Sequence, residues 1–177
     1  MKLKFKKIAE KAIIPKFAHE GDACFDFHII VDNNLNYPRS LSEVKKLTHT
    51  VSYTPLSDGK LDMSRPIVTI EPHCSVVFHT GLKCEIEPGY VLKIYPRSST
   101  GIKCALSLSN GTGVIDAGYR GEIMIALTNN SDKPRVIYDL DRVAQGQIQK
   151  LVDVEIEEVT ELSDTERGEG GIGSSGR

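Results

Sequence analysis

Apolar and polar residues alternate in short runs along most of this chain. Segments 91–95 (VLKIY) and 122–127 (EIMIAL) follow the two-residue period of a strand with one buried face. Proline, glycine and aspartate separate such runs, and the signal for helices is poor throughout. The pattern predicts an all-β sandwich or barrel, with strands over 3–8, 24–31, 67–71, 76–80, 83–86, 91–95, 106–109, 122–128, 135–138, 142–151 and 154–159.

Residues 32–65 break this pattern, because they are polar and contain no long apolar run. Ser40 and Glu43 have the spacing of a capping box, which predicts one or two helical turns over 41–47. We interpret the segment as an insertion on the β scaffold. Loops of this length are uncommon unless they are functional or disordered, so the insertion is either an arm for a protein partner or a neutral surface excursion.

The C-terminal tail breaks the pattern in a different way. Seven acids and no bases occupy 153–166, and five of the 15 glycines fall in 167–177. Glycine at this density opposes helix and strand through backbone entropy. The glycine-rich end is therefore either a disordered terminus or a flexible arm that closes over an anionic ligand.

Composition narrows the classes of protein that fit. The 177 residues, 40% of them hydrophobic, suit one domain, which we expect over 1–166 with the arm at 167–177. A net charge of −2 argues against a large nucleic-acid-binding face. No apolar run approaches membrane-spanning length, and the lysine-rich start is unlike a signal peptide, so we expect a cytoplasmic protein. The four cysteines and five histidines lack metal-ligand spacing, so any metal should be a hard cation that arrives with an oxygen-rich ligand.

Two segments carry most of the candidate chemistry. The segment 96–101 (PRSSTG) follows a predicted strand, and its guanidinium, hydroxyls and turn N–H groups could cradle a phosphate or simply form a turn. The segment 110–122 (NGTGVIDAGYRGE) reads as a glycine-flanked hairpin. In it, Asp116 is either a general base or a turn residue, and Tyr119 is either a core aromatic or a platform for a ring.

Five segments in one order resemble the motifs of the trimeric dUTPase family. They are GDACFDF at 21–27, PRSS at 96–99, the hairpin at 110–122, DRVAQ at 141–145, and RGEGGIGSSG at 167–176. The resemblance implies a jelly-roll-like β-barrel that assembles as a homotrimer with shared active sites. It also implies hydrolysis of dUTP to dUMP and pyrophosphate, which lowers dUTP and supplies dUMP for thymidylate synthesis.

The resemblance further implies a role for each matching residue. Asp116 would activate the water that attacks the α-phosphorus. The substrate-binding set would be Arg97, Ser98, Ser99, Asn110, Gly113, Val114, Ile115, Tyr119, Met124, Gln145, Arg167, Ile172, Gly173 and Ser174. Mg²⁺ would be held mainly by the triphosphate, with Asp26 reaching it through water only.

One residue of the arm departs from the family motifs, and two alternative functions compete with dUTP hydrolysis. Ile172 stands where the family usually has phenylalanine, so we expect closure with weaker nucleotide affinity. The related dCTP deaminase needs a glutamate ten residues after the hairpin aspartate, where this chain has Ala126. A scaffold that works by binding a protein partner through 32–65 is the other alternative.

Overall fold

The computed structural model describes residues 1–31, 51–55, 61–171 and 174. The helical turns predicted over 41–47 lie outside these residues, as do Ile172 and Gly173. The role of the insertion as a partner-binding arm stays a prediction, as does the domain boundary at 166. Among the described residues, no helix has the length and apolar character needed to cross a membrane.

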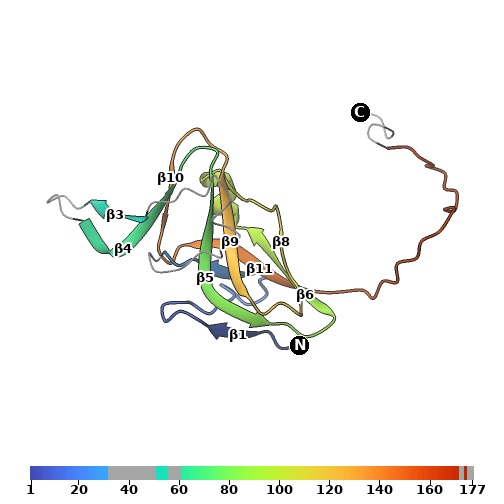
Figure 1. The fold of residues 1–177 in the computed structure, drawn as a ribbon, viewed down its shortest axis with the longest axis horizontal. Coiled ribbons are helices and arrows are strands. Elements are labelled where there is room, and N and C mark those ends of the chain that lie inside the picture. The colour runs from blue at the N-terminus through green and yellow to red at the C-terminus, as the bar shows by residue number, and fades with distance from the viewer. Residues whose placement is uncertain (32–50, 56–60, 172–173, 175–177) are drawn as a thin grey trace.

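Three antiparallel sheets make up the described fold (Figure 1). The first has the order β1-β5-β9-β7, the second β2-β11-β6-β8, and the third β10-β4-β3. Their strands are β1 (Lys4–Lys7), β2 (Phe25–His28), β3 (Val51–Pro55), β4 (Leu61–Ile70), β5 (Ser75–Glu85), β6 (Tyr90–Pro96), β7 (Leu106–Leu108), β8 (Gly113–Ile115), β9 (Glu122–Asn129), β10 (Arg135–Tyr138) and β11 (Arg142–Lys150). The described helix is a short π-helix, η1 (Ser99–Lys103). The predicted all-β class is confirmed.

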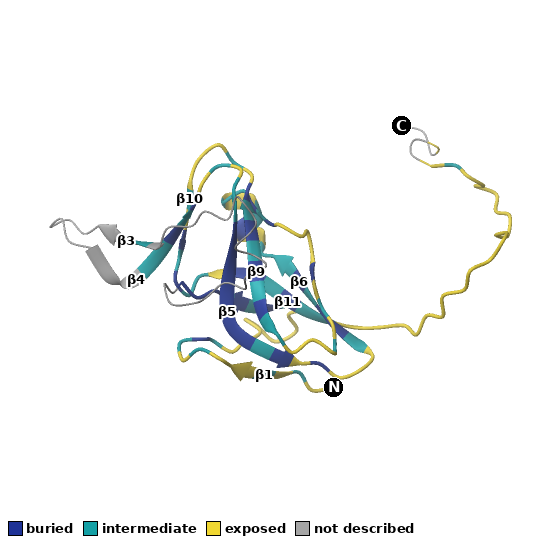
Figure 2. Ribbon diagram, viewed as in Figure 1, coloured by how far each residue is buried: buried dark blue, intermediate teal, exposed yellow. Residues whose placement is uncertain are grey.

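Burial along β9 and β5 shows why these strands form the centre of the core (Figure 2). In β9, Ile123, Ile125 and Leu127 are buried, while the residues between them are half-buried, as the alternation in sequence predicts. In β5, by contrast, every position over 76–82 is buried, because other parts of the fold cover both of its faces.

A glycine in β11 allows this core to close over an aromatic cluster. Phe25 and Phe27 lie edge to face, with ring centroids 5.7 Å apart. A Cβ added at Gly146 would lie 2.7 Å from a ring carbon of each phenylalanine. Only a residue without a side chain therefore fits at this point of the strand.

We expect Gly146→Ala to lower the free energy of unfolding by about 1–3 kcal/mol, because the methyl group overpacks the core. Chemical denaturation at one fixed protein concentration measures the change. Gly118→Ala is the matched control, since a Cβ there meets nothing within 4 Å. Equal stability of the two variants would contradict the prediction.

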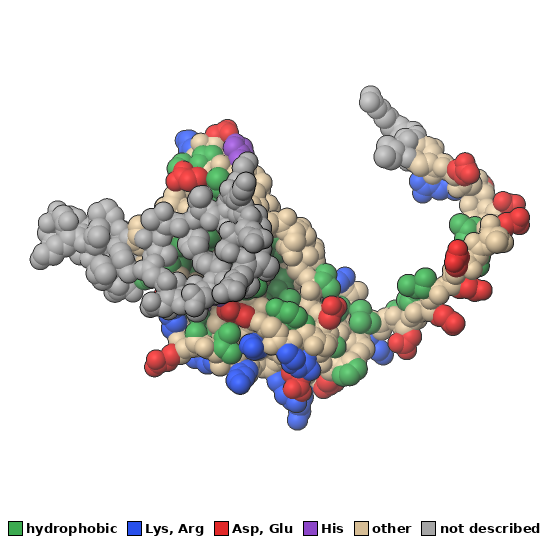
Figure 3. All heavy atoms as spheres, viewed as in Figure 1, with side chains coloured by type: hydrophobic (Ala, Val, Ile, Leu, Met, Phe, Trp, Pro, Cys, Tyr) green, Lys and Arg blue, Asp and Glu red, His purple; other side chains and the backbone are tan. Residues whose placement is uncertain are grey.

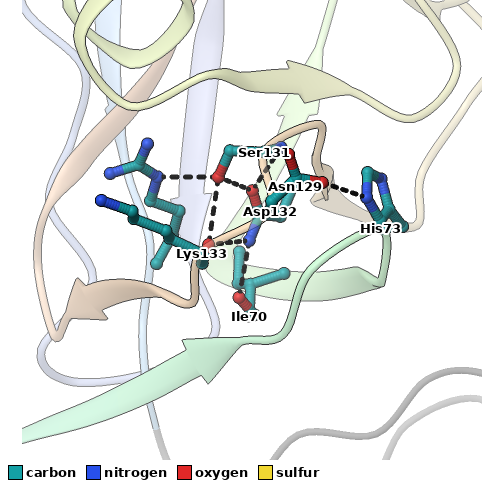
Figure 4. A network of polar contacts seen from close by, with 7 residues as sticks. Ile70, His73, Asn129, Ser131, Asp132 and Lys133 are labelled. Carbon is teal, nitrogen blue, oxygen red and sulfur yellow. Dashed lines mark hydrogen bonds and ion pairs between the residues drawn. The ribbon is translucent and has the colours of Figure 1, made fainter.

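A buried asparagine ties the first sheet to the third (Figure 4). The Asn129 side chain, at the end of β9, donates to the carbonyl of Ile70 at 2.9 Å and to that of Lys133 at 2.8 Å. Its Oδ1 accepts hydrogen bonds from the backbone N–H and the hydroxyl of Ser131. All these contacts satisfy a polar group that is fully buried, and they fix the β9–β10 turn against β4.

Several boundaries differ from the sequence prediction. The strands predicted over 76–80 and 83–86 are one strand, β5, with a bulge near Gly81, whose φ is 67°. Strands β3 and β4 occupy part of the predicted insertion, and β8 forms within the predicted hairpin.

The strand predicted over 154–159 is wrong. Residues 151–169 are exposed and extend away from the sheets after β11, with acidic side chains along them (Figure 3). The apolar–acidic alternation is strand-like, but the described chain offers this segment no partner strand for its backbone groups. Val154 and Ile156 are 75% and 92% exposed.

Candidate functional site

The order β2-β11-β6 in the second sheet brings three of the candidate segments side by side. Asp26 on β2 lies opposite Gln145 on β11, and Gln145 lies opposite Tyr95 on β6. The chain leaves β6 at Pro96 and enters η1 at Ser99, so Arg97 and Ser98 occupy the corner between them. Segment 96–101 therefore forms a corner and the start of a π-helix, where the sequence suggested a plain turn or cradle.

A cavity of about 480 Å³ opens at this corner. Four residues predicted to bind phosphate line it, and so does Asp26, which was predicted to reach the metal through water. The complete lining is Ala18, Asp22, Ala23, Cys24, Asp26, Arg97, Ser98, Ser99 and Gln145. Residues far apart in sequence thus line one cavity, and the role of this set in phosphate binding stays a prediction.

Two arginines share one carboxylate beside this cavity. Arg97 Nε lies 2.8 Å from Asp26 Oδ1, and Arg142 Nη1 lies 3.1 Å from Asp26 Oδ2. Arg97 also donates through Nη1 to the carbonyl oxygen of Arg142 at 3.2 Å. The two guanidinium groups outnumber the carboxylate that they share, but Asp22 lines the same cavity, so the charges of these four side chains balance. The guanidinium of Arg97 still offers charged N–H donors to an anionic ligand.

Gln145 is held in place by a strand-to-strand contact. Its Nε2 donates to the carbonyl oxygen of Pro96 at 3.0 Å. A primary amide carries a second N–H, and that group is available to a ligand in the cavity. The sequence interpretation of Gln145 as a neutral donor fits this geometry.

Two neighbouring groups are kept uncharged by their surroundings. Burial lowers the pKa of His28, and the positive charge of Arg142 lowers it further. Burial raises the pKa of the Cys24 thiol, and Asp22 and Asp26 add to that effect. A thiol held in its protonated form is a poor nucleophile, so the raised pKa does not favour covalent chemistry at Cys24.

The predicted base-binding hairpin lies elsewhere on the chain. Strand β8 pairs with the first half of β6, with Gly113 opposite Ile94 and Ile115 opposite Leu92. Asp116 follows β8 and is exposed, as is Asn110 before it. The described lining of the 480 Å³ cavity includes no residue of 110–119. One chain therefore does not bring the candidate base Asp116 to the candidate phosphate site.

Tyr119 is held over a glycine at the end of this hairpin. Its hydroxyl donates to the carbonyl oxygen of Glu122 at 2.9 Å, and its backbone N–H donates to the carbonyl of Asp116 at 3.0 Å. A Cβ at Gly121 would lie 2.3 Å from the tyrosine hydroxyl oxygen. The ring stays 39% exposed, so Tyr119 is not a core aromatic, and its role as a platform for a ring stays a prediction.

The remaining predicted residues lie on β9 and in the tail. Met124 is half-buried on β9, opposite His79 on β5. Arg167 is exposed, and its Nε donates to the carbonyl oxygen of Gly170 at 2.7 Å. Its Nη2 lies 3.5 Å from Ser174 Oγ, so both of these contacts of Arg167 are local to the arm.

The described residues offer no ready-made metal cage. No group of three or more histidine, cysteine, aspartate or glutamate side chains among them is placed to hold an ion. Each oxygen of Asp26 already accepts one guanidinium contact, which leaves a lone pair for a water molecule. The delivery of a cation by a phosphate ligand stays a prediction.

Sequence reasoning missed three residues at the site. Arg142 lies inside the segment 141–145, where only Gln145 received a role. Cys24 and Asp22 precede Asp26 in segment 21–27, and both line the cavity. Each of the three lies close in sequence to a residue that had received a role. Which way their side chains point, however, depends on how the strands pair.

Comparison with known proteins gives a consistent result. The model of the dUTPase family matches residues 58–176. A deoxyuridine 5′-triphosphate nucleotidohydrolase of Nautilia profundicola is 37% identical over 177 residues, which is 100% of both chains. A relative of the same name from Picosynechococcus is 34% identical and covers 99% of both chains.

Solved structures show the same fold. A variant of the dUTPase of Staphylococcus bacteriophage 80alpha, crystallised with dUpNHpp, has a TM-score of 0.72 at 24% identity and covers 99% of both chains. A dUTPase from Streptococcus mutans has a TM-score of 0.60 at 21% identity, covering 85% of this chain and 98% of its own.

Proposed function

This chain belongs to the dUTPase family and is a dUTP diphosphatase, and from that premise we propose how its residues divide the work. The cavity at Arg97, Ser98, Ser99 and Gln145 binds the triphosphate, and Asp116 activates water. The observation that carries the proposal is the convergence of three separate segments on one cavity, where a guanidinium, two hydroxyls and a side-chain amide lie together.

The reaction needs a base and a held phosphate chain. Asp116 accepts a proton from water while the water oxygen forms a bond to the α-phosphorus. The bond from that phosphorus to the α–β bridging oxygen breaks, and its electron pair leaves with pyrophosphate. Positioning and charge stabilisation supply most of the acceleration in phosphate transfer, so the fixed guanidinium and hydroxyls contribute as much as the base.

We place magnesium mainly on the triphosphate of the substrate and not on protein ligands. A magnesium ion carried by the triphosphate would supply positive charge against the departing pyrophosphate. Asp26 would hold such an ion through a water molecule. The two guanidinium contacts keep the Asp26 carboxylate oriented for that role.

The hairpin selects the nucleoside. Backbone groups of Gly113, Val114 and Ile115 bind the uracil edge, with Asn110 supporting the hairpin. Tyr119 packs on deoxyribose, and Met124 lines the nucleoside pocket. Fixed backbone donors discriminate strongly because a wrong base leaves them unpaired.

A complete site requires more than one subunit. The phosphate cavity and Asp116 occupy different parts of one chain, so we place them together across the interface of a homotrimer in the cytoplasm. The extended tail is exposed over 152–169, so it is free to reach a neighbour. There Arg167 binds the γ-phosphate, and Ile172, Gly173 and Ser174 close over the nucleotide.

The decisive experiment measures pyrophosphate release from dUTP, dCTP, dTTP and UTP with magnesium. We expect turnover of dUTP alone, because the hairpin excludes a 5-methyl group and Tyr119 excludes a 2′-hydroxyl. Equal hydrolysis of dTTP would overturn the assignment of the hairpin. Ammonia release from dCTP would revive the deaminase alternative, for which Ala126 provides no proton-transferring group.

A further inference from the structure

Arg142 has no assigned role, yet it contacts both residues that organise the phosphate cavity. Its Nη1 lies 3.1 Å from Asp26 Oδ2, and its carbonyl oxygen accepts the hydrogen bond from Arg97 Nη1. The Arg142 side chain itself is 51% exposed and is not part of the lining of the 480 Å³ cavity. Its printed polar contacts are with the binding residues, and it also lines a neighbouring cavity of about 300 Å³ together with Arg97 and Ser99.

These contacts determine which edge of Arg97 faces the ligand. The guanidinium is planar and has five N–H donors in a fixed fork. Arg97 Nε forms an ion pair with Asp26 Oδ1 at 2.8 Å, and the Arg142 carbonyl accepts one Nη1 hydrogen of Arg97. Two anchors on one plane leave the Nη2 edge for an anionic ligand, with little rotational freedom left to lose on binding.

Asp26 can serve as an anchor only while its own plane is fixed. Arg97 holds Oδ1 and Arg142 holds Oδ2, so the carboxylate is clamped from both sides. The β2–β11 pairing has an irregularity between Arg142 and Ala144. Such a bulge redirects a side chain relative to a regular ladder, and here the Arg142 side chain reaches the carboxylate.

We propose that Arg142 is a positioning residue for dUTP hydrolysis, which acts through Asp26 to hold the Arg97 guanidinium against the phosphates. The inference rests on the proposed role of Arg97 in phosphate binding. It predicts that the effect of Arg142 depends on Arg97, whereas a direct phosphate contact would act independently of it.

A double-mutant cycle tests this dependence in the full-length protein. The cycle consists of Arg142→Gln, Arg97→Gln and the double variant. Arg142→Lys is the conservative change. Lys150→Gln, at the exposed end of the same strand, is the control for lost charge. The readouts are kcat and KM for dUTP, together with inhibition by pyrophosphate, which probes the phosphate site, and by deoxyuridine, which does not.

We expect Arg142→Gln to weaken pyrophosphate inhibition and raise KM by roughly tenfold, and to leave deoxyuridine inhibition unchanged. Arg142→Lys should recover part of the loss, and Lys150→Gln should behave as wild type. In the Arg97→Gln background, Arg142→Gln should change pyrophosphate inhibition less than twofold, since the group it positions is gone.

Four outcomes would overturn the inference. A full tenfold effect in the Arg97→Gln background would show that Arg142 binds phosphate by itself. Equal loss of deoxyuridine binding would show a general structural role. If Arg97→Gln changes KM and pyrophosphate inhibition but Arg142→Gln does not, only the positioning role of Arg142 is rejected. If Arg97→Gln changes neither, the proposed role of Arg97 is rejected as well.

Discussion

Asp116→Asn is expected to lower kcat for dUTP hydrolysis by roughly two to four orders of magnitude, the range that a positioned general base contributes. The amide keeps the shape of the carboxylate but cannot accept the proton of the attacking water. Asp116 is exposed in the single chain, so the change removes no packing from the core. Pyrophosphate release under saturating dUTP measures the effect.

Binding distinguishes lost chemistry from a damaged site. The Asp116→Asn variant should bind dUpNHpp with nearly the affinity of wild type and should unfold at the same temperature. Asp132→Asn is the matched control, because the Asp132 side chain is 96% exposed and pairs with His73 away from the site. Near-normal turnover by Asp116→Asn would contradict the assignment of the base.

Deletion of residues 167–177 is the second change with a large expected effect. Turnover should fall roughly a hundredfold or more, because the deletion removes Arg167 and the segment that closes over the nucleotide. Thermal stability should not change, since the residues before the deletion, 151–166, already lie exposed and outside the core. Steady-state kinetics and a thermal melt on the same preparation test both halves of the prediction.

A chain that ends at Ser174 is the control for this deletion. It keeps Arg167, Ile172, Gly173 and Ser174, so it should retain most of the turnover. Loss of activity in both truncated proteins would place the critical contact in the last three residues. Full activity of the longer deletion would contradict a role for the arm.

Strand positions in the core could be predicted because burial acts on alternate residues. The EIMIAL run predicted β9, and its odd-numbered members are buried as expected. The same rule failed over 154–159, where valine and isoleucine alternate with acids. Alternation shows that a segment can form a strand, but pairing needs a neighbour, and the described chain provides none there.

The candidate residues could also be named in advance, but their arrangement could not. Asp26, Arg97 and Gln145 were identified separately, and the β2-β11-β6 order places them at one cavity. The shared contacts of Arg142 depend on an irregular register between β2 and β11. Side-chain direction changes with each one-residue shift in register, so no local pattern could have predicted them.

The sequence by itself determined the all-β class, the family and the residue types that the chemistry requires, because these depend on local periodicity and on motifs in a fixed order. Only the tertiary structure decided that Asp26 is clamped between Arg97 and Arg142 and that Asp116 lies apart from their cavity. Both features arise from contacts between segments separated by tens of residues, and strand pairing sets those contacts. That separation within one chain is the physical reason to expect an active site completed by neighbouring subunits.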